Sequence, residues 1–120
     1  MTVKRTNPDY LNGVPELLIL ELLSRRPRYG YELVQAIREA TGAELEFGEG
    51  CIYPILHRLE TQGLLGSRHE NVGGRNRVVY RVTKKGHKRF DESVANWRRI
   101  VETVNQVLQG GSHGKPALAQ

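Results

Sequence analysis

The chain has 120 residues, enough for one domain with a real core, and its hydrophobic content of 38% and charged content of 26% are ordinary for a globular protein. The longest apolar run, from Leu17 to Leu23, is interrupted by Glu21 and is too short to span a bilayer. No secretion signal opens the chain, and a single cysteine excludes an internal disulfide framework. We therefore expect a cytoplasmic protein that has no membrane partner.

The positive charge is concentrated in one short segment. The net charge is +5, to which residues 1–64 contribute −2, residues 65–89 contribute +7 and residues 90–120 contribute nothing. A patch of this kind suits a polyanionic partner such as nucleic acid. The composition alone leaves open that it is only a solvated face.

The first third of the chain predicts an arm followed by two helices. Residues 1–12 are polar and carry Lys4 and Arg5, which indicates a flexible basic arm. The run from Pro15 to about Arg26 is apolar almost all round, so this helix should lie at the centre of the core. A second helix is predicted from Tyr29 to Thr41, with Gly42 as its stop.

A short edge strand is predicted directly after that stop. Ala43, Leu45 and Phe47 alternate there with two glutamates, and alternation with a period of two is typical of a half-buried strand.

The stretch from Gly50 to Gly63 predicts a helix with one buried and one exposed face. At 100° per residue its apolar stripe consists of Ile52, Ile55, Leu56 and Leu59. The opposite face consists of Gly50, Pro54, His57 and Thr61, flanked by Tyr53 and Arg58. Pro54 is expected within about the first turn, where a missing N–H costs little, and Gly63 should end the helix. Such a helix can recognise a partner, although an ordinary core helix has the same pattern.

Two strands and a long helix are predicted for the second half of the chain. The strands run from Leu65 to Glu70 and from Arg77 to Thr83, with Gly73–Gly74 at the tip of their hairpin. Thr83 can cap a helix from about Lys84 to Gln109, and the remaining tail, residues 110–120, has no periodicity and is expected to be disordered.

A heptad seam runs along this last helix. Its members are Phe90, Val94, Trp97, Val101, Val104 and Leu108. Spacings of three and four residues are typical of helices that pair with another chain. The seam could instead pack on the core of its own domain, but that core is already supplied by three helices and a hairpin. We therefore expect a homodimer.

These elements together predict a mainly α fold with a small β-hairpin. Residues 13–85 would form a winged helix-turn-helix DNA-binding domain, and residues 86–109 a C-terminal dimerisation helix. In this arrangement the third helix enters the major groove of DNA while the hairpin, the wing, contacts phosphate or the minor groove.

The chain resembles the PadR family of transcriptional regulators, in the short form with a single C-terminal helix. The resemblance covers about Glu16 to Leu108 and rests on three strings: ELLILELLSRRPRYGYEL, GCIYPILHRLETQGLL and GGRNRVVYRVTKKG. By resemblance, Tyr31, Tyr53 and Pro54 fall on the family's YGYEL and IYP positions, and Gly74, Arg75 and Tyr80 fall on its wing motif. The family implies a homodimer on a palindromic operator, usually a repressor that a small molecule releases.

Seven residues are the candidates for contact with double-stranded DNA. They are Tyr31, Tyr53, Pro54, His57, Arg58, Arg75 and Arg77. Tyr53 could instead cap the core with its ring, and Arg58 could form a local ion pair with Glu60. Arg75 and Arg77 are expected at an exposed hairpin tip, where side chains do not pack in a core.

The seam residues have two interpretations. Trp97 is expected to pack in the dimer interface; by resemblance to multidrug-sensing relatives, it could also stack a flat aromatic effector.

Cys51 lies near a helix start, which can lower a thiol pKa and permit redox sensing, but a small buried side chain is the preferred interpretation.

No catalytic constellation is predicted. The histidines at positions 57, 69, 87 and 113 share no metal-ligand spacing with one another or with the cysteine, and no nucleophile motif or phosphate-binding glycine loop is present. We expect neither an enzyme nor a cofactor or metal. The alternative function is a winged helix that binds only protein, for which a neutral or acidic wing would be expected.

Overall fold

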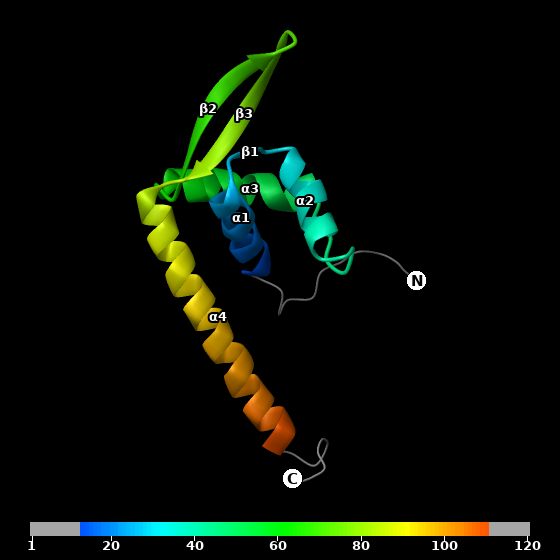
Figure 1. The fold of residues 1–120 in the computed structure, drawn as a ribbon, viewed down its shortest axis with the longest axis vertical. Helices are drawn as coiled ribbons and strands as arrows, with labels where there is room; N and C mark the ends of the chain where they lie inside the picture. Colours follow the sequence, from blue (N-terminus) through cyan, green and yellow to red (C-terminus); the bar gives the residue numbers. More distant parts are fainter. Residues whose placement is uncertain (1–12, 111–120) are drawn as a thin grey trace. The chain divides into compact units, whose positions relative to one another are not determined.

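The computed structural model describes residues 13–110, which form four α-helices and one three-stranded antiparallel sheet (Figure 1). The elements in chain order are α1 (Val14–Arg25), β1 (Arg28–Tyr29), α2 (Glu32–Ala40), α3 (Glu49–Thr61), β2 (Leu65–Val72), β3 (Arg75–Val82) and α4 (Lys84–Gly110). This architecture confirms the predicted fold class, a winged helix-turn-helix followed by a long C-terminal helix. The predicted arm, and the predicted tail beyond Gly110, lie outside the described residues.

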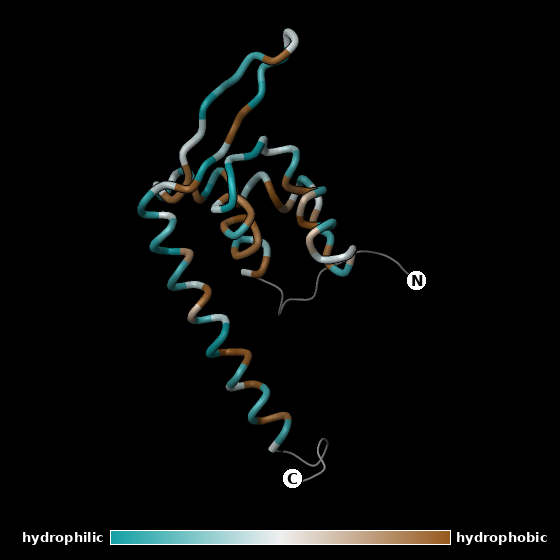
Figure 2. The backbone as a smooth tube through the Cα atoms, viewed as in Figure 1, coloured by the Kyte–Doolittle hydropathy of each residue, from teal (hydrophilic) through white to brown (hydrophobic). Residues whose placement is uncertain are grey.

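The chain divides into two compact units after Phe90, and each is described by itself. In the first unit α1 is the central helix, as its composition predicts, and most of its trace has the colour of hydrophobic residues (Figure 2). Ile19 and Leu20 have no exposed surface. They pack with Leu33 of α2 and Ile52 of α3 in one hydrophobic cluster. Burying a side chain of this size contributes about 2 kcal/mol to folding. Within residues 13–110 no helix is both long and apolar enough to cross a membrane.

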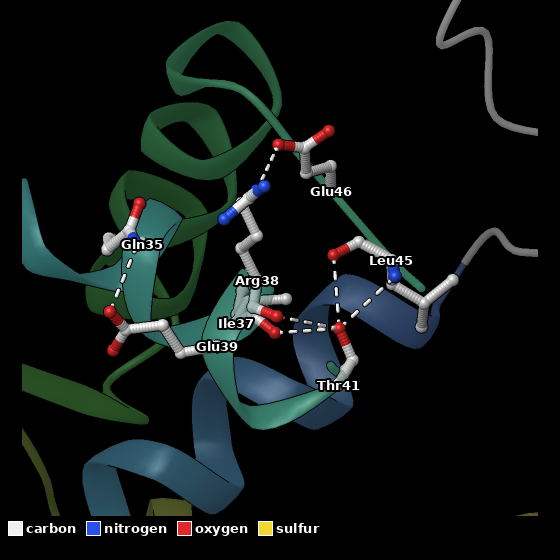
Figure 3. A network of polar contacts seen from close by, with 7 residues as sticks. All are labelled: Gln35, Ile37, Arg38, Glu39, Thr41, Leu45 and Glu46. Atoms are coloured by element: carbon white, nitrogen blue, oxygen red, sulfur yellow. Dashed lines mark hydrogen bonds and ion pairs between the residues drawn. The ribbon is translucent and has the colours of Figure 1, made fainter. Parts of the chain in front are cut away.

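The segment between α2 and α3 is a turn, so the edge strand predicted at residues 43–47 is wrong. Gly42 and Ala43 both adopt positive φ angles, 61° and 68°, which a strand excludes. The Thr41 hydroxyl donates to the Ile37 carbonyl at 2.9 Å and accepts the Leu45 N–H at 3.1 Å, and this closes the turn (Figure 3). Of the alternating apolar residues, Phe47 is 2% exposed and Leu45 is half-buried against the core, whereas Ala43 is exposed.

The third strand of the sheet lies earlier in the chain, at β1. Arg28 pairs with Tyr80 and Tyr29 with Val79, in the order β1-β3-β2. The predicted start of the second helix at Tyr29 is therefore wrong by three residues. Tyr29 is extended, and its N–H donates to the carboxylate of Glu32, the first residue of α2, at 2.8 Å.

Helix α3 ends as predicted. Gly63 has a φ of 78°, the Leu64 N–H donates to the Leu59 carbonyl at 2.9 Å, and the Gly63 N–H donates to the Glu60 carbonyl at 2.9 Å. These two hydrogen bonds satisfy carbonyls that a helix end leaves without partners. Pro54, however, lies inside the helix and not in its first turn, because the helix begins at Glu49. It has no N–H to donate to the carbonyl four residues earlier.

Strands β2 and β3 form the predicted hairpin, with eight residues in each strand. Val72 pairs with Arg75 across the two-residue turn Gly73–Gly74, whose φ angles are 58° and 80°. Positive φ at both positions is the geometry of a turn that matches the twist of paired strands, and glycine adopts it without strain. The hairpin projects beyond the three short helices (Figure 1), and we refer to residues 65–82 as the wing.

A set of contacts that we call the clasp joins residues 62–64, after α3, to residues 83–86, after β3. Leu64 accepts the Thr83 N–H at 3.1 Å, while the Thr83 hydroxyl donates to the Gly63 carbonyl at 2.7 Å and accepts the Gly86 N–H at 3.0 Å. Thr83 therefore caps α4, as predicted. The Lys85 ammonium donates to the Gln62 carbonyl at 2.9 Å. The clasp thus fixes the end of α3, the base of the wing and the start of α4 together.

Gly86→Ala is expected to destabilise the first unit. A Cβ at this position would lie 2.0 Å from the Leu64 carbonyl oxygen and 2.8 Å from Val82 Cγ1, so the backbone of the clasp would have to move. We expect a loss of about 3 kcal/mol in the free energy of unfolding, measured by urea denaturation. Gly50→Ala is the control, because its Cβ would meet no atom within 4 Å. Equal stability of the two variants would contradict the tight packing of the clasp.

Ala43→Gly is expected to stabilise the protein. A left-handed conformation costs an L-residue about 1–2 kcal/mol, which exceeds the extra entropy that glycine loses on folding. The net gain should be about 0.5 kcal/mol and should raise the Tm by a few degrees. Ala40→Gly, in the last turn of α2, should lower the Tm instead. A lower Tm for Ala43→Gly would mean that residue 43 is not held at a positive φ.

Candidate nucleic-acid interface

The exposed face of α3 is the one that the sequence predicts. Pro54, His57 and Thr61 are exposed, while Ile52 and Leu56 on the opposite side have no exposed surface. An imidazole and a hydroxyl can read the edges of bases in the major groove of DNA. This face therefore has the chemistry of a recognition surface.

Tyr53 lies at the edge of that face with its ring partly buried against the core. Its Cε1 and hydroxyl oxygen would lie 3.0 Å and 3.3 Å from a Cβ at Gly30, and Cε2 of Tyr80 would lie 3.1 Å from the same point. Gly30 therefore makes room for both rings. Burial raises the pKa of Tyr53, and the charge of Glu49 raises it further. The ring centroid of His57 is 6.2 Å away, so the two side chains lie on neighbouring turns of α3.

Arg58 is separated from the other candidates. Its guanidinium pairs with Glu16 of α1 at 3.1 Å, and Arg89 of α4 pairs with the second oxygen of the same carboxylate at 3.3 Å. The local ion pair with Glu60, which the sequence left open, does not form, and the Glu60 carboxylate instead accepts the Ser67 hydroxyl at 2.5 Å. Arg58 therefore ties α3 to α1.

Arg77 is packed rather than free at the tip of the wing. Its guanidinium carbon lies 5.0 Å from the ring centroid of Tyr31 and 5.5 Å from that of Tyr29, and it donates a hydrogen bond to the Tyr31 hydroxyl. The two rings are stacked, with their centroids 5.6 Å apart. Cation–π packing of this kind fixes the direction of a guanidinium without using all of its N–H groups.

Glu70 links the same ring pair to a second wing arginine. One carboxylate oxygen accepts the Tyr29 hydroxyl at 3.0 Å, and the other accepts Arg68 Nη2 at 2.7 Å and Nε at 3.1 Å. The hydrogen bond from Arg68 lowers the pKa of Glu70, and the bond from Tyr29 lowers it further. The hydrogen bond to Glu70 raises the pKa of Tyr29. The carboxylate is therefore ionised at neutral pH.

A surface hollow lies between the wing and the start of α2. Its lining residues are Tyr31, Arg75, Asn76 and Arg77. No carboxylate within residues 13–110 pairs with Arg75, which is exposed beside the Gly73–Gly74 turn. Two guanidinium groups, an amide and a phenol hydroxyl offer donors that match a phosphate.

The structure thus gathers the seven candidates into three places. Tyr53, Pro54 and His57 lie together on α3; Tyr31, Arg75 and Arg77 line one hollow; and Arg58 is paired elsewhere. Four further residues were missed: Glu16, Tyr29, Gly30 and Glu70. The spacing of the tyrosines around Gly30 is the one signal in the sequence that could have pointed to the stacked rings and to the glycine beneath them.

Along α4 the predicted seam is mostly exposed in the single chain. Trp97, Val101, Val104 and Leu108 are between 37% and 49% exposed, and Val107, beside the seam, is 71% exposed. Phe90 differs, because it is half-buried against the hydrophobic cluster of the first unit. Trp97 and Val101 line a hollow with Arg98, Glu102, Asn105, Gln106 and Gln109, so its lining is more polar than the dry aromatic pocket expected.

Within residues 13–110, the cysteine and the histidines show no reactive or metal-binding arrangement. Burial raises the pKa of the Cys51 thiol, which is the opposite of the change that redox sensing requires. In the part of the chain that the structure describes, no three histidine, cysteine or acidic residues are placed to hold a metal ion.

Comparison with known proteins identifies relatives of this chain. Residues 19–92 match the model of the Transcriptional regulator PadR-like family. Transcriptional regulator YqjI of Escherichia coli is 33% identical over 101 residues, which cover 84% of this chain and 47% of YqjI, so the chain spans about half the length of that relative. Transcriptional regulator Rv3488 of Mycobacterium tuberculosis is 45% identical over 64 residues, 53% of this chain and 57% of that protein.

Solved structures show the same fold. A transcriptional regulator from Clostridium thermocellum has a TM-score of 0.78 at 28% identity and covers 82% of this chain and 97% of its own. A PadR family regulator from Eggerthella lenta has a TM-score of 0.77 at 32% identity over 86% of this chain and 88% of its own. The chain therefore belongs to the PadR-like family of transcriptional regulators.

Proposed function

We propose that this protein is a sequence-specific DNA-binding repressor, which acts in the cytoplasm as a homodimer on a palindromic operator and is released by a small molecule. The observation that carries the DNA-binding part is the pairing, within one compact unit, of an exposed polar face on α3 with a basic wing beside it. A helix and a wing that present such groups fit the major groove and the flanking phosphates.

In this proposal the two parts of the surface have different tasks. Pro54, His57 and the edge of Tyr53 face the bases, where hydrogen bonds and apolar contacts carry sequence information. Arg75 and the remaining N–H groups of Arg77 bind phosphate oxygens and set the position of the wing. Arg58, paired with Glu16, is no longer expected to read bases and is assigned to holding α3 in place.

The homodimer is supported by the exposed apolar residues of α4. A single chain leaves Trp97, Ile100, Val104 and Leu108 each more than two-fifths exposed, and a second copy would cover them. A dimer would also present two copies of α3 to two half-sites, which accounts for a palindromic operator. An aromatic effector would bind beside Trp97, where it could alter the pairing of the helices.

A winged helix that binds only protein remains the second candidate. It requires a wing whose charge serves solubility alone. The hollow lined by Tyr31, Arg75 and Arg77 favours DNA, because two guanidinium groups and a phenol hydroxyl share one hollow and can donate to a phosphate.

Arg75→Ala is expected to weaken DNA binding and to reduce its dependence on salt. The loss of one phosphate contact should lower the slope of log K against log salt by about 0.9 and weaken binding several-fold at low salt. The measurement is fluorescence anisotropy with a duplex from the protein's own upstream region and a scrambled duplex. Arg25→Ala is the control, because Arg25 pairs with Glu21 on α1.

Three outcomes of this titration are informative. Tighter binding to the upstream duplex than to the scrambled one supports an operator-binding regulator. Equal binding to both by the wild type contradicts sequence specificity at that site. No binding to either duplex at low salt would favour the protein-interaction module.

Val104→Glu is expected to convert a dimer to a monomer. A carboxylate in the middle of the seam would be buried without a partner when two copies of α4 pair. Analytical ultracentrifugation should show about half the mass of the wild type at micromolar concentration. Thr103→Glu adds the same group off the seam and should leave the dimer intact; a monomeric wild type, or a dimeric Val104→Glu, would contradict the assignment of the interface.

A further inference from the structure

Glu70 is the only acidic residue between positions 65 and 89, a segment that carries eight lysines and arginines. A wing that serves only to attract DNA gains nothing from a carboxylate, because a carboxylate repels phosphate. Its presence in the middle of β2, directly opposite Arg77 in the sheet, therefore needs an explanation.

The contacts of Glu70 show what its charge acts on. Both recorded bonds from Arg68, Nη2 at 2.7 Å and Nε at 3.1 Å, end on the same carboxylate oxygen. The Tyr29 hydroxyl holds the other oxygen at 3.0 Å. Tyr29 is itself fixed by β1 and by its stack with Tyr31. The carboxylate is therefore anchored to the body of the domain, and Arg68 is anchored to the carboxylate.

The held arginine is placed where it could otherwise reach DNA. Arg68, Glu70 and Arg77 project from one face of the wing, because residues paired opposite each other, and residues two apart, share a face. Arg77 on that face lines the hollow beside Tyr31. The side chain of Arg68 is 58% exposed and that of Glu70 is 31% exposed, so solvent and a phosphate have access to the pair.

We propose that Glu70 is a specificity-determining residue, which holds Arg68 in the Tyr29–Glu70–Arg68 chain of hydrogen bonds and so limits the number of phosphates that the wing neutralises. This inference rests on the proposed function. Phosphate contacts carry no sequence information and supply nearly all of the affinity for unrelated DNA. An arginine that is paired within the protein adds less to that affinity than one that is not. The carboxylate thus lowers binding to unrelated sequences while leaving the reading face of α3 untouched.

The direct test is Glu70→Gln, which keeps the shape of the side chain and its capacity to accept a hydrogen bond but removes the charge. The weaker neutral contact should let Arg68 turn to phosphate. On the scrambled duplex, we expect binding to tighten several-fold at low salt and the slope of log K against log salt to steepen by about 0.9. Anisotropy titrations over a salt series measure both quantities.

Two further variants separate this mechanism from a simple change in net charge. Glu21→Gln removes one carboxylate from another Glu–Arg pair, on α1, and should leave the scrambled-duplex affinity within about twofold of the wild type, since an exposed charge away from DNA is screened. In an Arg68→Gln background, Glu70→Gln should have little additional effect, because the arginine that it releases is absent.

The binding of these variants to the scrambled duplex distinguishes the proposal from its alternatives. A gain in the Glu70→Gln variant that disappears in the Arg68→Gln background supports the proposal. An equal gain in scrambled-duplex affinity in both backgrounds, or a gain in Glu21→Gln, would overturn the proposal and indicate general charge repulsion. Unchanged or weaker binding by Glu70→Gln would also overturn it. If the wild type binds neither duplex at low salt, the proposed function itself fails.

Discussion

The clasp between residues 62–64 and 83–86 is the constraint on which the rest of the first unit depends. The Leu64 carbonyl lies so close to position 86 that only glycine fits there, and Thr83 bonds both to the end of α3 and to the start of α4. Because β2 and β3 leave from the same corner, the base of the wing and the C-terminal end of α3 have one fixed relation. DNA recognition by a helix and a wing needs that relation to be fixed before binding, since ordering it afterwards would cost affinity.

Much of the fold could be predicted from the sequence because the signals are local. The positive φ at Gly63, the Gly73–Gly74 turn and the Thr83 cap each follow from a residue type whose backbone or side chain suits one conformation. The errors arose where tertiary packing, and not the local sequence, determined the backbone conformation. Ala43, Leu45 and Phe47 alternate like a strand, yet Ala43 is exposed at a positive φ, and Leu45 and Phe47 pack on the core from an irregular segment. The sequence places Tyr29 at the start of the second helix, but Tyr29 pairs with Val79 of β3 and therefore belongs to the sheet.

The candidate site was less predictable, because charge and exposure do not reveal partners. Arg58 and Arg77 both appear as exposed cations in the sequence. One is paired with Glu16, 42 residues away, and the other is stacked on two tyrosines, one of them 46 residues away. Such long-range contacts leave no periodic trace in a single sequence. What the sequence did predict well is the exposed face of α3, since helical spacing alone separates Pro54 and His57 from the buried Ile52 and Leu56.

Two arginines of this surface are held by other side chains of the protein: Arg77 by aromatic rings and Arg68 by a carboxylate. The central claim, that α3 and the wing form one DNA-binding surface, can be tested most directly by NMR titration of the isotopically labelled protein with its upstream duplex. The account predicts the largest amide shifts at Tyr31, at His57 and Thr61 of α3, and at Arg75 and Asn76 of the wing, with little change along the exposed side of α1. Shifts confined to α4, or spread evenly over the protein, would contradict it.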